Sequence, residues 1–301
     1  MPIIKKNDVT PERPIIIVIY GTPGSGKTSA AITANSPILI DTDRGYDRAV
    51  QRVDTIEARR WQDIDSEMDT IKTYKTVIVD TAKSMLDDYL SIYAVEQNYK
   101  LKTNSLKRFG QMFDDFKLFV NTLRNGGSDI IFICHDKETA EGDIIKHSPD
   151  CTGQSKDLLL RIADQVGYIS VVNGKRVITF EPSDNFVGKN VAKLPAIIIP
   201  DYNSNEFPTF MATIINQVKA SIMNKSDAQN KAMQQLAELR EQLAAVMTEE
   251  EAAALVNACG ELPEVLKLPF FKEMKEHLAS KGFTYDKETK LFKLQSDETA
   301  A

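Results

Sequence analysis

The sequence predicts an α/β protein with a central, mostly parallel sheet, followed by a smaller and mainly helical domain. Three observations support this fold class. An apolar run at 15–20 leads through a glycine-rich loop into a helix, which is typical of a parallel sheet buried on both faces. Further apolar runs alternate with helical segments along the chain. Beyond residue 224 the composition becomes rich in Ala, Glu and Leu, which favours helices.

Length and composition limit the class of protein. The chain has 301 residues, 42% hydrophobic and 27% charged, which suits one large domain with a small appendage. No apolar run is long enough to cross a membrane, and the first residues lack a signal-peptide core. The three cysteines (Cys134, Cys151 and Cys259) have no metal-ligand spacing, so we expect a reduced, cytoplasmic protein without a membrane partner.

The domain boundaries follow from changes in composition. Residues 1–14 are polar and punctuated by proline, and we predict an N-terminal arm there. We predict a core over 15–222, a linker at 223–230 and a mainly helical C-terminal domain over 231–301. The helices expected after the core lie near 227–247, 249–258 and 270–280, and a capping box starts at Thr248. Residues 283–285 and 290–292 are expected to pair as a small hairpin.

The glycine-rich loop reads G-x-x-x-x-G-K-T from Gly21 to Thr28, between a strand and a helix, which is the context of a P-loop. Its glycines let backbone N–H groups curl around phosphates. Lys27 is expected to reach the β- and γ-phosphates, and Thr28 to bind Mg²⁺. The alternative is a chance match in a glycine-rich turn. The predicted nucleotide-binding residues are Gly21, Thr22, Pro23, Gly24, Ser25, Gly26, Lys27, Thr28 and Ser29.

Acidic residues end the next two firm strands. The strand over 36–41 leads into Asp41-Thr42-Asp43, and the strand over 76–81 contains Asp80. Ligands bind at this carboxyl edge in open α/β sheets. An apolar strand ending in Asp is the Walker B pattern, so Asp80 is predicted to hold Mg²⁺ together with Thr28. Between and after these strands we expect a short strand at 53–56 and helices at 61–72 and 82–95.

A basic segment without acids follows. Within residues 99–109 the chain carries four cations and two aromatic residues. This composition predicts contact with single-stranded nucleic acid, because cations neutralise phosphates and aromatic faces stack on bases. A solvated helix face is the alternative. The predicted contact residues are Tyr99, Lys100, Lys102, Lys107 and Arg108.

The remaining core elements are predicted in order. A helix over 110–124 precedes a fourth strand at 129–134, which is followed by His135 and a polar loop to about residue 156. A helix at 156–164 leads to two apolar runs, 166–172 and 175–180, joined by Asn-Gly, the strongest hairpin signal. A last strand at 196–199 and a helix at 208–222 complete the core.

The order of these motifs resembles the RecA/RadA recombinase core. The residues that carry the resemblance are the P-loop, Ile40-Asp41-Thr42-Asp43, Val79-Asp80-Thr81, Ile133-Cys134-His135 and Thr152-Gly153-Gln154. More narrowly, the tract from Ile15 to about Tyr202 is similar to phage RecA-like nucleotide-binding proteins of the Sak type, some of which are annealing or recombination ATPases. The stretch from Gly188 to Pro195 supports this branch. The resemblance implies a RecA-like P-loop NTPase core with a C-terminal hairpin, and residues 225–301 lie outside it.

The resemblance also implies roles for single residues. Asp43 matches the acid that activates water in RecA, where it is Glu, so the shorter side chain puts the efficiency of hydrolysis in doubt. His135 matches the γ-phosphate sensor, which is Gln in RecA. Lys189, and after it Lys193, match the lysine that reaches a neighbouring subunit's nucleotide. The plain alternatives are a turn cap for Asp43, an ordinary polar residue at a strand end for His135 and a surface lysine for Lys189.

Three further expectations concern ligand contacts, and the last two rest on the same resemblance. Tyr46 and Asp47, one turn past Asp43, are candidates for contacting the adenine edge. The loop at 99–108 matches a DNA-contacting loop of RecA. The loop at 136–156 would be the second such loop, but its acids make the match poor.

We therefore expect a cytoplasmic protein that binds and hydrolyses ATP, forms homo-oligomers, binds single-stranded DNA and acts in phage recombination, annealing or replication. The cytoplasm is that of the bacterial host if the protein is phage-encoded. A single-strand-binding protein or another replication protein is an expected partner of the C-terminal domain. The alternative is a nucleotide-gated scaffold with slow turnover that acts through its C-terminal helices. A small-molecule kinase would need arginines in its lid, and an ABC ATPase or a GTPase would need motifs that are absent. An AAA+ motor would usually have Glu after Asp80, where this chain has Thr81.

Overall fold

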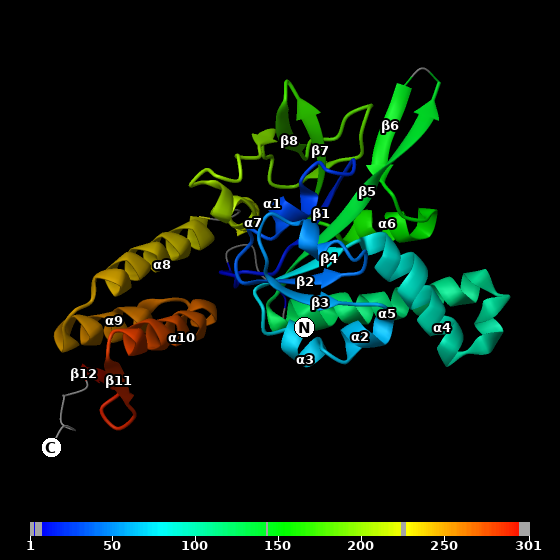
Figure 1. Ribbon diagram of the computed structural model, residues 1–301. Coiled ribbons are helices and arrows are strands. Elements are labelled where there is room, and N and C mark those ends of the chain that lie inside the picture. The colour runs from blue at the N-terminus through cyan, green and yellow to red at the C-terminus, as the bar shows by residue number, and fades with distance from the viewer. Residues whose placement is uncertain (1–2, 4–7, 143, 224–226, 295–301) are drawn as a thin grey trace. The chain divides into compact units, whose positions relative to one another are not determined.

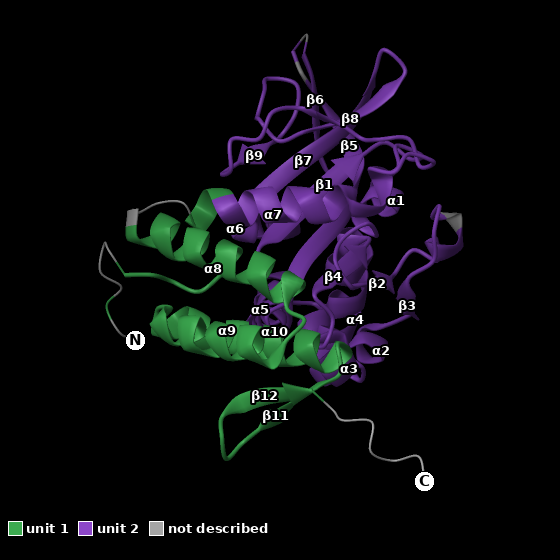
Figure 2. Cartoon of the chain, turned by 90° about the vertical axis from the view of Figure 1, so that its left-hand side faces the viewer, with its two compact units in different colours: residues 1–12, 221–301 green, residues 13–220 purple. Residues whose placement is uncertain are grey.

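The structure, a computed structural model, describes residues 3, 8–142, 144–223 and 227–294 (Figure 1). The chain divides into two compact units, which are coloured separately in Figure 2. One unit comprises residues 13–220, and the other comprises residues 1–12 together with 221–301.

The larger unit is built on one ten-stranded sheet. Its central strands follow the order β10-β8-β7-β1-β5-β4-β2-β3, and β1 is paired in parallel with both β5 and β7. The strands are β1 (Ile16–Gly21), β2 (Pro37–Asp41), β3 (Asp54–Glu57), β4 (Thr76–Asp80), β5 (Asp129–Glu141), β6 (Ile144–Pro149), β7 (Gln165–Val172), β8 (Lys175–Thr179), β9 (Lys189–Asn190) and β10 (Ile197–Ile198). The predicted α/β fold with a mostly parallel sheet is confirmed.

β1 lies at the middle of the sheet because it can be buried on both faces. Ile16, Val18 and Tyr20 point into one hydrophobic core, and the alternate residues Ile17 and Ile19 are fully buried as well. Such a continuous apolar run suits a central parallel strand flanked by helices on both sides. The glycine-rich loop therefore starts from a strand that is buried on both faces.

Helices connect the strands and cover the sheet (Figure 1). Helix α5 packs its side chains Met112, Phe116 and Leu123 into the same core as β1. The helices and helical turns are α1 (Lys27–Ala31), η1 (Tyr46–Arg48), α2 (Trp61–Asp65), α3 (Met68–Ile71), η2 (Ser84–Leu90), α4 (Ser91–Gln97), η3 (Tyr99–Lys102), α5 (Ser105–Gly126), α6 (Gly153–Ile162), η4 (Phe207–Thr209) and α7 (Phe210–Met223).

The region predicted as a polar loop at 136–156 is an antiparallel hairpin over most of its length. β5 continues past the sheet to Glu141 and pairs with β6, with Glu138 opposite His147. Ile144 and Ile145 on β6 are adjacent in sequence and both exposed. Apolar and polar residues therefore do not alternate along this hairpin in the way that predicts a half-buried strand. The prediction of an unstructured loop was wrong for this reason.

Other boundaries also differ from the prediction, and two of the differences have a visible structure. The helix expected over 61–72 consists of two short helices, α2 and α3, separated at Ser66–Glu67. Helix α5 begins at Ser105, because the side chain of Asn104 accepts the N–H of Lys107 and caps it there. The hairpin between β7 and β8 is confirmed, with positive φ angles at Asn173 and Gly174.

The smaller unit has its own core. It contains α8 (Asp227–Ala245), α9 (Glu249–Glu261), α10 (Glu264–Ser280) and a hairpin of β11 (Phe283–Asp286) with β12 (Leu291–Leu294). The capping box predicted at Thr248 is present, with Glu251 as its partner. From the N-terminal segment, Val9 packs against this core, and the N–H of Thr10 donates to Gln229.

The predicted linker at 223–230 is only partly visible. Residues 224–226 lie outside the described residues, and residues 227–230 already belong to α8. Among the described residues, no helix is both long and apolar enough to cross a membrane.

Candidate functional site

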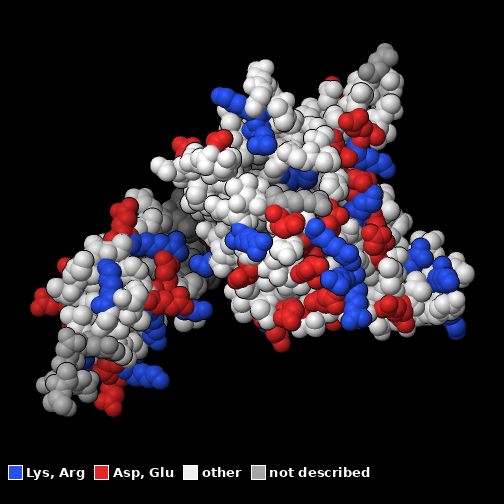
Figure 3. Space-filling model, viewed as in Figure 1, with Lys and Arg blue, Asp and Glu red and all other residues white. Residues whose placement is uncertain are grey.

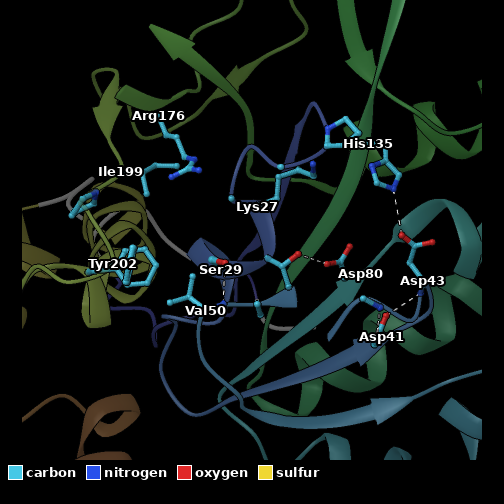
Figure 4. A pocket seen from close by; sticks show the side chains of 18 residues that line it. Lys27, Ser29, Asp41, Asp43, Val50, Asp80, His135, Arg176, Ile199 and Tyr202 are labelled. Carbon is cyan, nitrogen blue, oxygen red and sulfur yellow. Dashed lines mark hydrogen bonds and ion pairs between the residues drawn. The ribbon is translucent and has the colours of Figure 1, made fainter. Parts of the chain in front are cut away.

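A cavity of about 380 Å³ opens where the glycine-rich loop meets the carboxyl ends of β2 and β4 and the middle of β5, at His135 (Figure 4). Strand register brings these positions together, because Asp41 lies beside Asp80 and Gly21 lies beside His135. The residues that line the cavity are Pro23, Gly24, Gly26, Lys27, Thr28, Ser29, Asp41, Asp43, Gly45, Ala49, Val50, Asp80, His135, Arg176, Ile199, Pro200, Tyr202 and Phe207.

The glycine-rich loop has the backbone of a phosphate cradle. Gly26 has a φ of 87° and is the N-cap of α1, and Gly24 also has a positive φ. A Cβ atom on Gly21 would lie 2.5 Å from the carbonyl oxygen of Ile169 on β7, so only glycine fits there. Among the other predicted loop residues, Thr22 is exposed and Ser25 is buried, and neither lines the cavity.

Lys27 lies inside this loop. Its Nζ donates to the carbonyl oxygens of Gly21 and Thr22, at 2.8 and 2.9 Å. Burial lowers the pKa of Lys27, and the nearby Asp80 opposes that shift. The ammonium is thus held at the cavity by weak neutral acceptors, which a phosphate oxygen can replace.

Thr28 and Asp80 are in direct contact. The Thr28 hydroxyl donates to Oδ2 of Asp80 at 2.5 Å, and burial raises the pKa of Asp80. Mg²⁺ prefers oxygen ligands, and P-loop proteins bind it with a hydroxyl at the end of the loop and a carboxylate at the end of a neighbouring strand. The residues present therefore fit the predicted magnesium site.

Asp41 and Asp43 have different environments. The buried carboxylate of Asp41 accepts the backbone N–H groups of Asp43, Gly45 and Tyr46, at 3.0, 2.9 and 2.9 Å. Asp41 therefore holds the turn that follows β2. The side chain of Asp43 is about half exposed and lies at the cavity, so it is free to meet a water molecule.

Asp43 and His135 face one another across the cavity (Figure 4). Nε2 of His135 lies 3.6 Å from Oδ2 of Asp43. Nδ1 of His135 is buried and has no hydrogen-bond partner among the described residues. The structure thus brings together two residues that the resemblance had marked separately.

The opposite end of the cavity is mainly apolar. Val50, Ile199 and Tyr202 lie at this end (Figure 4), and Pro200 and Phe207 also line the cavity. None of the five stood out as a site residue in the sequence. A tyrosine and a proline directly after the last strand were the only sequence signal for them. An apolar surface of this kind suits a nucleotide base.

Tyr46 and Asp47 do not line the cavity, although we expected them near the base. They lie in η1, where the N–H of Tyr46 is bound to Asp41. The segment contributes Gly45, Ala49 and Val50 to the cavity instead. Ser29 does line it, and its hydroxyl oxygen accepts the N–H of Val50 at 3.4 Å.

Lys189 is engaged within its own chain. Its Nζ donates to the carbonyl oxygens of Leu160 and Arg161, at 3.2 and 3.5 Å, in the last turn of α6. A lysine at this position stabilises the carboxyl end of a helix. Neither Lys189 nor Lys193 lines the cavity of this chain.

The predicted DNA-binding residues lie on η3 and on the first turn of α5. Figure 3 shows Lys and Arg side chains over α4 and η3, at the right-hand edge, without Asp or Glu between them. Tyr99 is 73% exposed, and Nζ of Lys102 lies 5.3 Å from the centre of its ring. Arg108 donates to the backbone carbonyl of Lys102, which ties the two elements together.

Apolar side chains accompany these cations. Ile92 and Leu106 are exposed near them, and a shallow cavity of about 410 Å³ is lined by Ser91, Ile92, Val95, Glu96, Tyr99, Lys102 and Arg108. The acid Glu96 belongs to α4 and lies outside the segment read as free of acids. We define the basic patch as Tyr99, Lys100, Lys102, Lys107 and Arg108.

Comparisons with known proteins identify a family for most of the larger unit. A family described as an AAA domain (AAA_24) matches residues 13–191, which is most of the larger unit. No curated protein matches. Of 255 solved chains that match, one is titled as the crystal structure of the RadB recombinase. It is 14% identical, with a TM-score of 0.35, and covers 56% of this chain and 80% of its own.

Proposed function

Because the chain belongs to the AAA domain family, whose match covers the P-loop and Asp80, we propose that it is a Mg²⁺-dependent ATPase that binds single-stranded DNA. We further propose a role in phage DNA annealing, recombination or replication. Thr81 follows Asp80 at a position where AAA+ motors usually have Glu, and this position lies within the family match.

The ATPase proposal rests on three sets of residues that line the same cavity. Lys27 supplies a cation, Thr28 and Asp80 form the metal pair, and Asp43 and His135 face the cavity beside them. Phosphoryl transfer needs mainly charge neutralisation and a positioned water molecule. Each of these needs has a candidate residue within the cavity.

The mechanism follows from these positions. Lys27 would leave the loop carbonyls and donate to the β- and γ-phosphates. Asp43 would accept a proton from water as the water oxygen bonds to the γ-phosphorus and the bond to the β-phosphate oxygen breaks. ADP and phosphate would then leave. Mg²⁺, held by Thr28 and Asp80, would neutralise charge on the transferring phosphate.

The apolar end of the cavity supports a bound base. Tyr202 and Ile199 lie on the side away from Asp80 and Asp43 (Figure 4), so a triphosphate that runs along the loop would place its base there. We propose that this base is adenine.

The basic patch supports the proposal of DNA binding. The whole chain has a net charge of −6, so a polyanion needs a local cationic surface to bind. The patch combines four cations with the exposed ring of Tyr99, and the apolar cavity beside it can take an unstacked base.

Changing Lys100, Lys102, Lys107 and Arg108 together to Ala is expected to weaken single-stranded DNA binding and its salt dependence. Each lost phosphate contact reduces the log–log salt slope by about 0.7, so the slope should flatten by roughly 2 to 3 units. Fluorescence anisotropy of a labelled oligonucleotide over a salt series would measure both effects.

A control with the same charge change is available in the smaller unit. Lys231, Lys272, Lys287 and Lys290 are all exposed, and changing them to Ala should leave the slope unaltered. ATP binding should survive in both variants, because Lys27 and Asp80 are untouched. Equal DNA affinity and slope in the patch variant and the wild type would contradict the proposal.

We also propose that the protein forms homo-oligomers and that ATP favours them. Lys189 is the candidate residue for a neighbouring subunit's nucleotide, although it would first have to leave the α6 carbonyls. Light scattering of the wild type with and without ATP and DNA is expected to show a larger mass with both. A strict monomer at high protein concentration would refute this.

The second candidate function, a nucleotide-gated scaffold, is favoured by the separate core of the smaller unit. The ATPase rate with and without single-stranded DNA separates the two. Stimulation by DNA supports the ATPase, whereas slow turnover that DNA does not change supports the scaffold.

A further inference from the structure

Arg176 is the feature of the cavity that the proposed function has not used. Among the described residues that line the cavity, only Lys27 and Arg176 belong to the permanently cationic types Lys and Arg. Three acids (Asp41, Asp43 and Asp80) line the same space. A nucleotide polyphosphate would add further negative charge, so a second cation beside Lys27 has an electrostatic use.

The sheet places Arg176 over the glycine-rich loop. β7 lies beside β1, with Ile169 in register with Gly21, the last residue of β1. β7 then continues beyond that end, and Arg176 on β8 pairs with Val171. The hairpin of β7 and β8 therefore extends beyond the carboxyl end of β1, where the glycine-rich loop begins.

The side chain of Arg176 is in contact with the loop. A Cβ atom built on Gly26 would lie 3.3 Å from Cδ and 3.5 Å from Nε of Arg176. Gly26 is the residue directly before Lys27 and the N-cap of α1. The guanidinium thus lies beside the glycine-rich loop, next to Gly26.

No hydrogen bond or ion pair of the Arg176 side chain is found among the described residues, although its backbone carbonyl accepts the N–H of Ile199. Its neighbour Lys175 does not line the cavity. An arginine without an acidic partner, aimed into a cavity that acids line on its far side, is available for an anionic ligand.

Its position along the cavity indicates which phosphates it can reach. Figure 4 shows Arg176 on the side of Ile199 and Tyr202, with Lys27 between it and Asp80. Asp43 and His135 lie beyond Asp80, where the γ-phosphate would be attacked. Arg176 is therefore nearer to the expected base than to the reacting phosphorus.

We propose that Arg176 is a nucleotide-binding residue that donates to the α- and β-phosphates of a nucleotide bound in its own chain. This proposal rests on the proposed nucleotide site and assigns Arg176 to binding and positioning. A planar guanidinium can donate to two phosphate oxygens at once, which an ammonium cannot do.

The test compares the affinities for ATP and for ADP. Isothermal titration calorimetry with Mg²⁺ would measure both dissociation constants for the wild type, Arg176→Ala, Arg176→Lys and the control Lys175→Ala. Arg176→Ala is expected to weaken ATP and ADP equally, by about 10- to 100-fold, because both nucleotides carry the α- and β-phosphates. Arg176→Lys should lie between, and Lys175→Ala should match the wild type.

Turnover gives a second measurement. At saturating ATP the kcat of Arg176→Ala should remain close to that of the wild type, while its KM rises with the dissociation constant. A loss confined to ATP, a fall in kcat at unchanged affinity, or unchanged binding of both nucleotides would each overturn the proposal.

The outcomes for the two proposals are distinguishable. A wild-type protein that bound neither nucleotide would overturn the proposed function, and this assignment with it. A wild type that binds both, with an Arg176 variant that binds equally well, would overturn this assignment alone. Thermal unfolding would verify the fold of each variant, and Arg176→Lys carries the test if Arg176→Ala does not fold.

Discussion

Lys27→Ala is expected to abolish ATP hydrolysis and to weaken ATP binding. The ammonium is the loop's only side-chain cation and already lies against the carbonyls of Gly21 and Thr22. Removing it deletes the charge that would meet the γ-phosphate where negative charge develops, a loss of at least about 10²-fold in rate. A coupled phosphate-release assay and a titration of ATP would measure the two effects.

Lys175→Ala is a suitable control, because Lys175 is exposed and outside the cavity. Lys27→Ala also removes two hydrogen bonds to loop carbonyls, so thermal unfolding should accompany the rate measurement. Wild-type hydrolysis in a folded Lys27→Ala protein would exclude the P-loop as the catalytic site.

Asp43→Asn is expected to slow hydrolysis by a factor of about 10² to 10⁴ while ATP binding persists. Asparagine keeps the shape of the side chain but is a much weaker base, so it cannot take the proton of the attacking water. The half-exposed position of Asp43 at the cavity, opposite His135, supports this role. Single-turnover hydrolysis together with ATP titration would separate the chemical step from binding.

The neighbouring acids provide matched controls. Asp47 lies outside the cavity, so Asp47→Asn should leave the rate of ATP hydrolysis unchanged. Asp41→Asn is expected to lower the thermal stability, because one amide oxygen cannot replace a carboxylate that accepts three N–H groups. Normal hydrolysis by Asp43→Asn would show that this carboxylate is not the base.

Much of the larger unit was predictable because its strands are apolar and end in recognisable motifs. The runs around β1, β4 and β5 needed burial on both faces, and the Asn-Gly pair determined the hairpin of β7 and β8. The β5–β6 hairpin escaped prediction because it contributes little to the core and so carries no apolar alternation. Its pairing becomes visible only when both strands are seen together.

The site was predictable only where one local motif carries it. Lys27, Thr28 and Asp80 follow from such motifs, and the structure places them together. Arg176 and Tyr202 reach the cavity through the pairing of β7 with β1 and of β10 with β8, which are long-range contacts. Tyr46 was misplaced because the local spacing after Asp43 does not reveal that Asp41 binds the turn.

The continuity of β5 restricts where the length of this chain can change. The strand runs unbroken from Asp129 to Glu141, and His135 lies beside Gly21 just before the antiparallel pairing begins at Asp136. Inserting or deleting one residue between Ile130 and His135 would exchange the two faces of the strand, and His135 would turn away from the cavity. Length variation at this site is therefore compatible with the cavity only beyond Asp136, toward the tip of the hairpin.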